Sequence, residues 1–106
     1  MEKPKPPNHL RDPGRAYWQA VTGEFALEDH HLAILQTACE ALDRAAEARE
    51  VIEKVGVLIV PKGGGMARAN PATRIEKDSM LLFLRAQAAL GLDVEQAAPV
   101  GRPPGR

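Results

Sequence analysis

The feature that most constrains the fold is a long run without glycine or proline, which ends at Gly56. Glu28 and Asp29 suit the positive end of a helix dipole, so a helix is expected to begin there and to continue to Val55. A helix of roughly 27 residues is about 40 Å long at 1.5 Å per residue. The 106-residue chain is therefore expected to form one domain around this helix, and it is too short for two.

Apolar residues of this run form two stripes at helical spacing. The first carries larger side chains and consists of Leu32, Leu35, Cys39, Leu42 and Ala46. The second, which we call the alanine stripe, lies on an adjacent face and consists of Ile34, Ala38, Ala41, Ala45, Ala48, Ile52 and Val55. A surface helix needs only one apolar stripe, so this helix is expected to have neighbours on two sides. We predict that the alanine stripe is an interface between subunits of a homo-oligomer. The alternative is a self-contained bundle that buries its central helix.

Helices are expected on both sides of the long one. Asp12 as an N-cap followed by Pro13 predicts a first helix that runs to about Thr22 and stops at Gly23. Trp18 in that helix is interpreted as a core anchor rather than a residue that stacks on nucleic-acid bases.

The signal for the last long helix is Asn70 followed by Pro71, with an end near Leu90 before Gly91. One apolar face of this helix is predicted to consist of Ile75, Ser79, Leu82, Ala86 and Ala89. Asp93 is expected to cap one further short turn, through Ala98.

Between the long helices the pattern becomes typical of β-structure. Val57–Val60 is a β-branched run that Pro61 stops, and Met66–Ala69 can pair with it as a hairpin around Gly63–Gly65. The predicted fold class is therefore mainly α, with a helical core, one long central helix, a short β-hairpin between the long helices and flexible termini. Residues 1–9 and 99–106 are rich in proline and are predicted to be disordered, so the single domain spans residues 10–98.

The sequence offers little for catalysis or for a cofactor. Adjacent helical residues point about 100° apart, so His30 and His31 are interpreted as a solvated pair and no metal is predicted. Lys62 precedes its glycines, whereas a phosphate-binding loop places the lysine after them and opens a helix. Cys39 is expected to be a small core residue, because one cysteine cannot form an internal disulfide.

The carboxylate pairs of the long helix are likewise read as a solvated polar face. Glu47 and Glu50 are interspersed with arginines and have no nucleophile beside them. We therefore predict a protein that is not an enzyme.

Charge is balanced overall but uneven along the chain. There are 14 basic and 14 acidic residues, yet residues 23–56 carry three basic and eight acidic groups. A DNA contact would need a local basic patch, which an oligomer repeats around its axis. The candidate DNA-binding residues are Lys3, Lys5, Arg11, Arg15, Lys62, Arg68 and Arg74. Contacts of this kind go to phosphate, tolerate any sequence and weaken with salt.

Nothing in the sequence predicts export or membrane insertion. The first 20 residues lack an apolar signal core, and no run approaches ~18 apolar residues. We therefore expect a location in the cytoplasm and no membrane partner.

The order of these elements resembles the small terminase subunits of tailed phages, over roughly residues 10–95. The resemblance rests on Trp18, Leu27–Leu35, the Gly56–Val60 strand with its glycine-rich tip, Asn70–Glu76, Leu81–Leu84 and Leu90–Asp93.

The resemblance implies a non-catalytic component of viral DNA packaging in the cytoplasm of the bacterial host. It would form a homo-oligomeric ring of roughly eight to ten subunits. The ring would engage double-stranded DNA with weak sequence specificity, and would recruit and regulate the large terminase subunit, an ATPase and nuclease. The alternative is a helical adaptor or regulator that binds protein and has no direct affinity for DNA.

Overall fold

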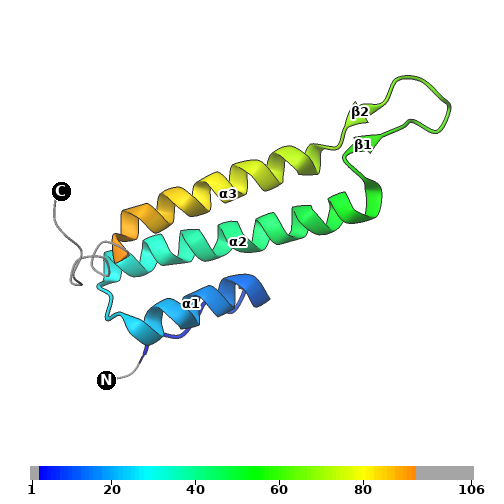
Figure 1. The fold of residues 1–106 in the computed structure, drawn as a ribbon. Coiled ribbons are helices and arrows are strands. Elements are labelled where there is room, and N and C mark those ends of the chain that lie inside the picture. Colours follow the sequence, from blue (N-terminus) through cyan, green and yellow to red (C-terminus); the bar gives the residue numbers. More distant parts are fainter. Residues whose placement is uncertain (1–2, 93–106) are drawn as a thin grey trace, which may run out of the picture.

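The computed structural model describes residues 3–92 and contains three helices and one hairpin (Figure 1). The helices are α1 (Asp12–Glu24), α2 (Asp29–Val55) and α3 (Pro71–Leu90). Two short antiparallel strands, β1 (Leu58–Ile59) and β2 (Arg68–Ala69), lie between α2 and α3. The mainly α prediction, with a long central helix and a hairpin, is confirmed. The predicted turn at 93–98 and the tail at 99–106 lie outside the described residues.

Helix α2 lies between α1 and α3, so its two apolar stripes have two neighbours from the same chain (Figure 1). The contact of α2 with α3 is the more extensive one. Helix α1 covers only the N-terminal half of α2, so the end next to the hairpin has two helices rather than three.

The main core lies where all three helices meet. Trp18 and Val21 of α1 pack with Leu35 and Cys39 of α2 and with Leu90 of α3. Trp18 is buried, which confirms its role as a core anchor. Toward the hairpin a smaller cluster consists of Ala48, Ile52 and Ala72.

The start of α1 is held by a carboxylate from α2. Asp43 is buried, and its two carboxylate oxygens accept hydrogen bonds from the backbone N–H groups of Arg11 and Gly14, each at 2.7 Å. Arg11 occupies the N-cap position without a side-chain cap, and Asp12 is the first helical residue. The prediction of Asp12 as N-cap is therefore wrong, because the cap comes from a residue distant in sequence.

The buried face of α3 differs from the predicted one. Its buried residues are Ala72, Ser79, Ala86 and Leu90, whereas Ile75 and Leu82 are exposed. Small residues of α2 and α3 therefore form most of the seam. Leu90 joins the main core, whereas the other large apolar residues stay exposed, namely Met80, Leu81, Leu82 and Leu84.

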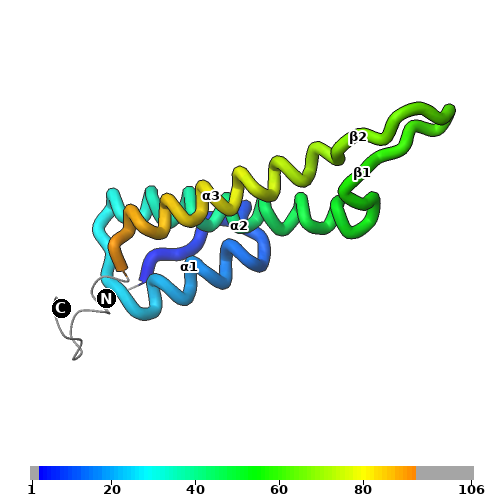
Figure 2. The backbone as a smooth tube through the Cα atoms, turned by 45° about the horizontal axis from the view of Figure 1, so that its top comes forward, coloured from blue at the N-terminus to red at the C-terminus, as the bar shows by residue number. Residues whose placement is uncertain are grey.

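The hairpin is shorter than predicted, and Asn70 holds its base. The Asn70 side chain accepts a hydrogen bond from Ala72 N at 3.0 Å and donates one to Gly56 O at 2.8 Å. Gly56 adopts φ 101°, ψ 168°, a conformation open essentially only to glycine. The end of α2 and the start of α3 are therefore fixed to one another, while the hairpin extends beyond both helices (Figure 2).

Residues 3–9 were assigned to the disordered arm in the sequence analysis, and in the structure they run alongside α1 (Figure 2). Trp18 Nε1 donates a hydrogen bond to Pro4 O at 3.0 Å, and Leu10 N donates one to Pro7 O at 3.2 Å. Leu10 itself is buried in the main core, so it anchors the end of this segment.

In the described residues, no helix is long and apolar enough to cross a membrane.

The close approach of α1 to α2 predicts opposite effects for two glycines of α1. A Cβ atom at Gly14 would lie 2.7 Å from Cys39 O and 2.8 Å and 2.9 Å from the Asp43 carboxylate oxygens, whereas at Gly23 it would lie 3.9 Å from Lys3 Nζ. Gly14→Ala is expected to lower the free energy of unfolding by about 1–3 kcal/mol through overpacking. Gly23→Ala is the matched control and should raise it by up to about 1 kcal/mol. Urea unfolding followed by circular dichroism measures both, and equal effects would contradict the close contact.

Candidate interaction surfaces

The alanine stripe is used inside the chain. Ala38, Ala41, Ala45, Ala48 and Ile52 are all buried in the single protomer, Ile34 is half-buried, and Val55 is exposed. The second neighbour of α2 is therefore α3 of the same chain. The buried positions of the stripe therefore contact their own chain, and Ile34 and Val55 are its members that keep exposed surface.

Large apolar side chains remain uncovered in two regions of the described chain. The first is the hairpin, residues 57–69, where Val57, Leu58, Val60 and Met66 are 57–79% exposed. The second is the outward surface of α3 with the end of α2, where the exposed residues are Val51, Val55, Ile75, Met80, Leu81, Leu82 and Leu84.

One groove lies between α2 and α3, close to the hairpin. Its volume is about 330 Å³, and four apolar residues, Ala48, Val51, Ala72 and Ile75, line it together with Arg44 and Glu47. We call it the α2–α3 groove. Because α1 does not reach this end of the molecule, no helix of the described chain covers it.

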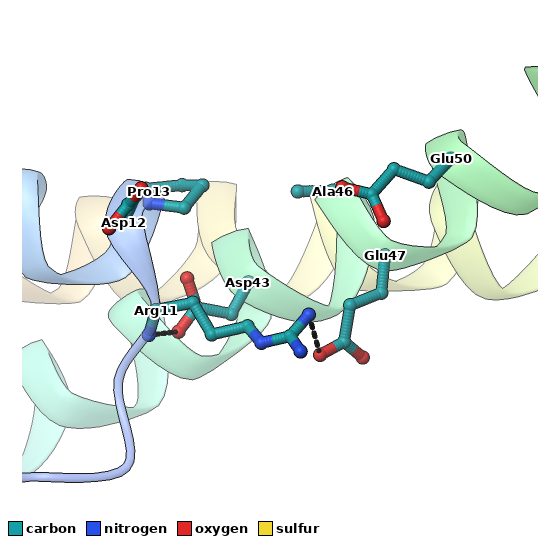
Figure 3. A pocket seen from close by; sticks show the side chains of 7 residues that line it. All are labelled: Arg11, Asp12, Pro13, Asp43, Ala46, Glu47 and Glu50. Carbon is teal, nitrogen blue, oxygen red and sulfur yellow. Dashed lines mark hydrogen bonds and ion pairs between the residues drawn. The ribbon is translucent and has the colours of Figure 1, made fainter.

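A second depression lies where α1 begins on α2 (Figure 3). It has a volume of about 460 Å³ and is lined by Arg11, Asp12, Pro13, Asp43, Ala46, Glu47 and Glu50. We call it the acidic cleft, because its four carboxylates face a single arginine. That arginine is engaged, since Arg11 Nη1 lies 2.9 Å from Glu47 Oε2 (Figure 3). The cleft repels phosphate and suits a cationic partner.

In the structure, some of the predicted DNA-binding residues already bind other groups of the chain, and others are exposed. Arg11 pairs with Glu47, and Arg15 Nη2 donates to Leu10 O at 2.9 Å, where it braces the segment before α1. Arg74 Nε lies 3.7 Å from Asp78 Oδ2, an exposed pair that screening by water makes weak.

The remaining basic candidates lie at opposite ends of an elongated molecule. Lys3 and Lys5 are exposed in the segment that runs alongside α1, where Lys3 lies near Gly23, whereas Lys62 and Arg68 are exposed on the hairpin. Figure 2 shows the two segments at opposite ends. One protomer therefore brings no more than two of these open basic residues together on one element.

Three potential metal ligands meet at the start of α2, contrary to the expectation from helical spacing. One ligand atom each of Glu28, His30 and His31 lie within 4.8 Å of one another, and the two imidazole centroids are 4.1 Å apart. Glu28 and His30 are exposed, and His30 Nδ1 lies 3.7 Å from Glu28 Oε1, so these groups face water and one another. The arrangement therefore remains a solvated cluster in our interpretation.

Cys39 is chemically inert in the folded chain. Burial, followed by the nearby charges of Asp43 and Glu40, raises the pKa of its thiol to about 12. Glu40 shows the opposite effect, because hydrogen bonds from Gln36 and His9 lower the pKa of its carboxyl. Neither group is arranged as a nucleophile with a base.

Sequence reasoning missed Asp43 and the α2–α3 groove. Asp43 lies among the polar residues of α2, and only its contact with a distant helix distinguishes it from a solvated carboxylate. The groove depends on which face α3 turns toward α2. The exposed leucines of α3 were a signal available in the sequence, because they exceed what one buried face can hold.

Comparison with protein families gives one decisive match. The family described as phage terminase, small subunit, matches residues 14–105, which is most of the chain. The chain belongs to this family. No curated protein and no solved structure matches it. The small-subunit match confirms the resemblance seen in the sequence.

The buried thiol provides a test of the packing between α1 and α2. Cys39 should react with Ellman's reagent at pH 8 at least 100-fold more slowly in the folded protein than in 6 M guanidinium, since its pKa of about 12 leaves little thiolate. Trp18→Ala opens the contact above the thiol and should raise the rate. Comparable rates in native and denatured wild type would contradict the burial.

Proposed function

We propose that this chain assembles into a homo-oligomeric ring, engages double-stranded DNA, and recruits and regulates the large terminase subunit. Family membership gives it a role in phage DNA packaging, and the small subunits of such terminases are generally non-catalytic. The proposed ring has roughly eight to ten copies and acts in the cytoplasm of the bacterial host. The large subunit is proposed to supply the ATPase and nuclease activities.

The observation that carries the assembly proposal is the apolar surface left uncovered by the protomer. Monomeric proteins rarely expose large contiguous apolar patches, and such patches mark interaction sites. Here exposed Val, Leu, Ile and Met side chains extend from the hairpin along α3. With the alanine stripe buried, the part of this surface next to the hairpin, on the last turns of α2 and the first turns of α3, replaces it as the proposed interface.

The DNA proposal rests on the hairpin. Lys62 and Arg68 project from an element that has no acidic residue, and the glycine-rich tip allows close approach to a phosphate backbone. A symmetric ring repeats these charges, so a weak site becomes a ring of positive potential. The result would be binding that tolerates any sequence and is sensitive to salt.

A second candidate is a protein-binding adaptor without affinity for DNA. The zero net charge and the acidic cleft favour it, because most nucleic-acid-binding domains are basic overall. In this case the uncovered apolar surface would still contact other protein chains.

Light scattering of the purified chain, with and without a 30-base-pair duplex, tests both candidates. We expect a mass near eight to ten times 11.5 kDa, and a further gain with DNA at low salt. An oligomer whose mass does not increase when DNA is added at 50 mM salt would favour the second candidate, the protein-binding adaptor. A monomer at all concentrations would contradict the ring.

Substitution of the hairpin cations tests the DNA contact. Lys62→Ala with Arg68→Ala should weaken binding at least tenfold at 100 mM salt and flatten its salt dependence, because fewer counterions are released. Lys77→Ala with Arg85→Ala removes the same charge from α3 and is the matched control. Equal loss in both double variants, measured by fluorescence anisotropy, would show that only net charge matters.

A further inference from the structure

We propose that the hairpin of one copy docks into the α2–α3 groove of the next copy. This inference rests on the proposed homo-oligomer and names the two surfaces that form it. The occupant of the groove is thus residues 57–69 of a second copy of this chain.

The hairpin lacks a surface to pack on in its own protomer. It has only two paired residues on each strand, and a two-stranded ribbon of this size is marginal in water. It extends beyond the ends of α2 and α3, away from the helices (Figures 1 and 2). Val60 and Met66 are 66% and 79% exposed, so these apolar side chains have no cover in the described chain.

The α2–α3 groove offers the complementary apolar surface. Val51 and Ile75 are 43% and 45% exposed, and the small side chains of Ala48 and Ala72 leave room between them. A segment that carries Val, Leu and Met side chains would bury them against these four residues. Hydrophobic burial is then the driving force of the contact.

Charge selects the same pair of surfaces. The segment from Gly56 to Thr73 carries Lys62 and Arg68 and no acidic residue. Glu47 lines both the α2–α3 groove and the acidic cleft, so Asp12, Glu47 and Glu50 extend a negative surface beside the apolar one. Arg44 also lines the groove, and Arg11 neutralises Glu47 in part, but carboxylates remain in excess. In the docked pair Arg68 of β2 meets this acidic margin, whereas Lys62, in the turn at the tip of the hairpin, stays available to phosphate.

The arrangement of the two surfaces favours a contact between copies. The hairpin points along the long axis and away from α2 and α3 (Figure 1), whereas its own groove lies between these helices. In this position the hairpin can reach the groove of another chain. Each copy then offers a hairpin to one neighbour and a groove to the other. Such head-to-tail contacts generate a ring when the rotation closes.

Two complementary defects test this contact. The hairpin variant combines Val60→Asp with Met66→Asp, and the groove variant combines Val51→Asp with Ile75→Asp. All four positions are exposed, so the fold should survive, as circular dichroism can check. Each variant alone should be monomeric by light scattering. Mixed together, they retain one intact hairpin and one intact groove, and should form a species of twice 11.5 kDa.

The matched control is Leu81→Asp with Leu84→Asp, at 44% and 52% exposure on the outward surface of α3. It should keep the wild-type mass. An oligomeric wild type whose mass survives both the hairpin and the groove defects would overturn this inference and leave the proposed ring in place. A monomeric wild type would overturn both.

Cross-linking keeps the test independent of any loss of stability. In a chain with Val60→Cys and Val51→Cys, mild oxidation with diamide should join neighbours into a ladder on a denaturing gel, up to the full ring. The native Cys39 is buried and should not take part in the cross-linking. Val60→Cys with Leu81→Cys should give no ladder, and a ladder from this control in place of the first pair would overturn the docking geometry.

Discussion

The seam between α2 and α3 is the constraint on which the rest of the molecule depends. Ala48 of α2 packs with Ala72 of α3, and Ser79 and Ala86 are also buried, so the seam is built largely from small residues. Because small side chains fill most of the seam, most of the larger apolar residues of α3 stay exposed, whereas Leu90 is buried in the main core. The packing inside the protomer thus determines which surface is left for a partner. Most leucines of α3 are exposed because alanines occupy most of the seam with α2.

The second constraint is the cap that α2 provides for α1. Asp43 satisfies two backbone donors of α1, and Gly14 allows the helices to come close enough for this. In the described part of the chain no buried side-chain nitrogen or oxygen is left without a hydrogen-bond partner. Unpaired buried polar groups are costly, so this pairing fixes where α1 begins along α2. The uncovered half of α2 is a direct consequence.

Local signals in the sequence predicted the ends of α2 and α3 well, whereas α1 continues through the predicted stop at Gly23 to Glu24. Asn70 with Pro71 and the ends at Gly56 and Gly91 depend on backbone geometry within a few residues, and the structure confirms them. Which helix packs on each apolar stripe of α2 depends on contacts between segments distant in sequence, and hydrophobic periodicity carries no information about those contacts. For this reason the alanine stripe was assigned to a neighbouring subunit, and Asp12 was given the role that Asp43 has. For the basic candidates, the sequence did not reveal that a carboxylate already engages Arg11 and that a backbone carbonyl engages Arg15.

The unequal coverage of α2 gives the molecule two ends of different rigidity. Where Trp18 joins three helices, amide protons should exchange only through global unfolding. Beyond Glu47 only α3 supports α2, with Ala48, Ile52 and Ala72 as a small core, so local opening costs less free energy there. A partner that covered this end would slow amide exchange there. The extent to which this end is folded would then depend on the concentration of the subunit. Fold and assembly would be linked equilibria at one end of the chain and independent at the other.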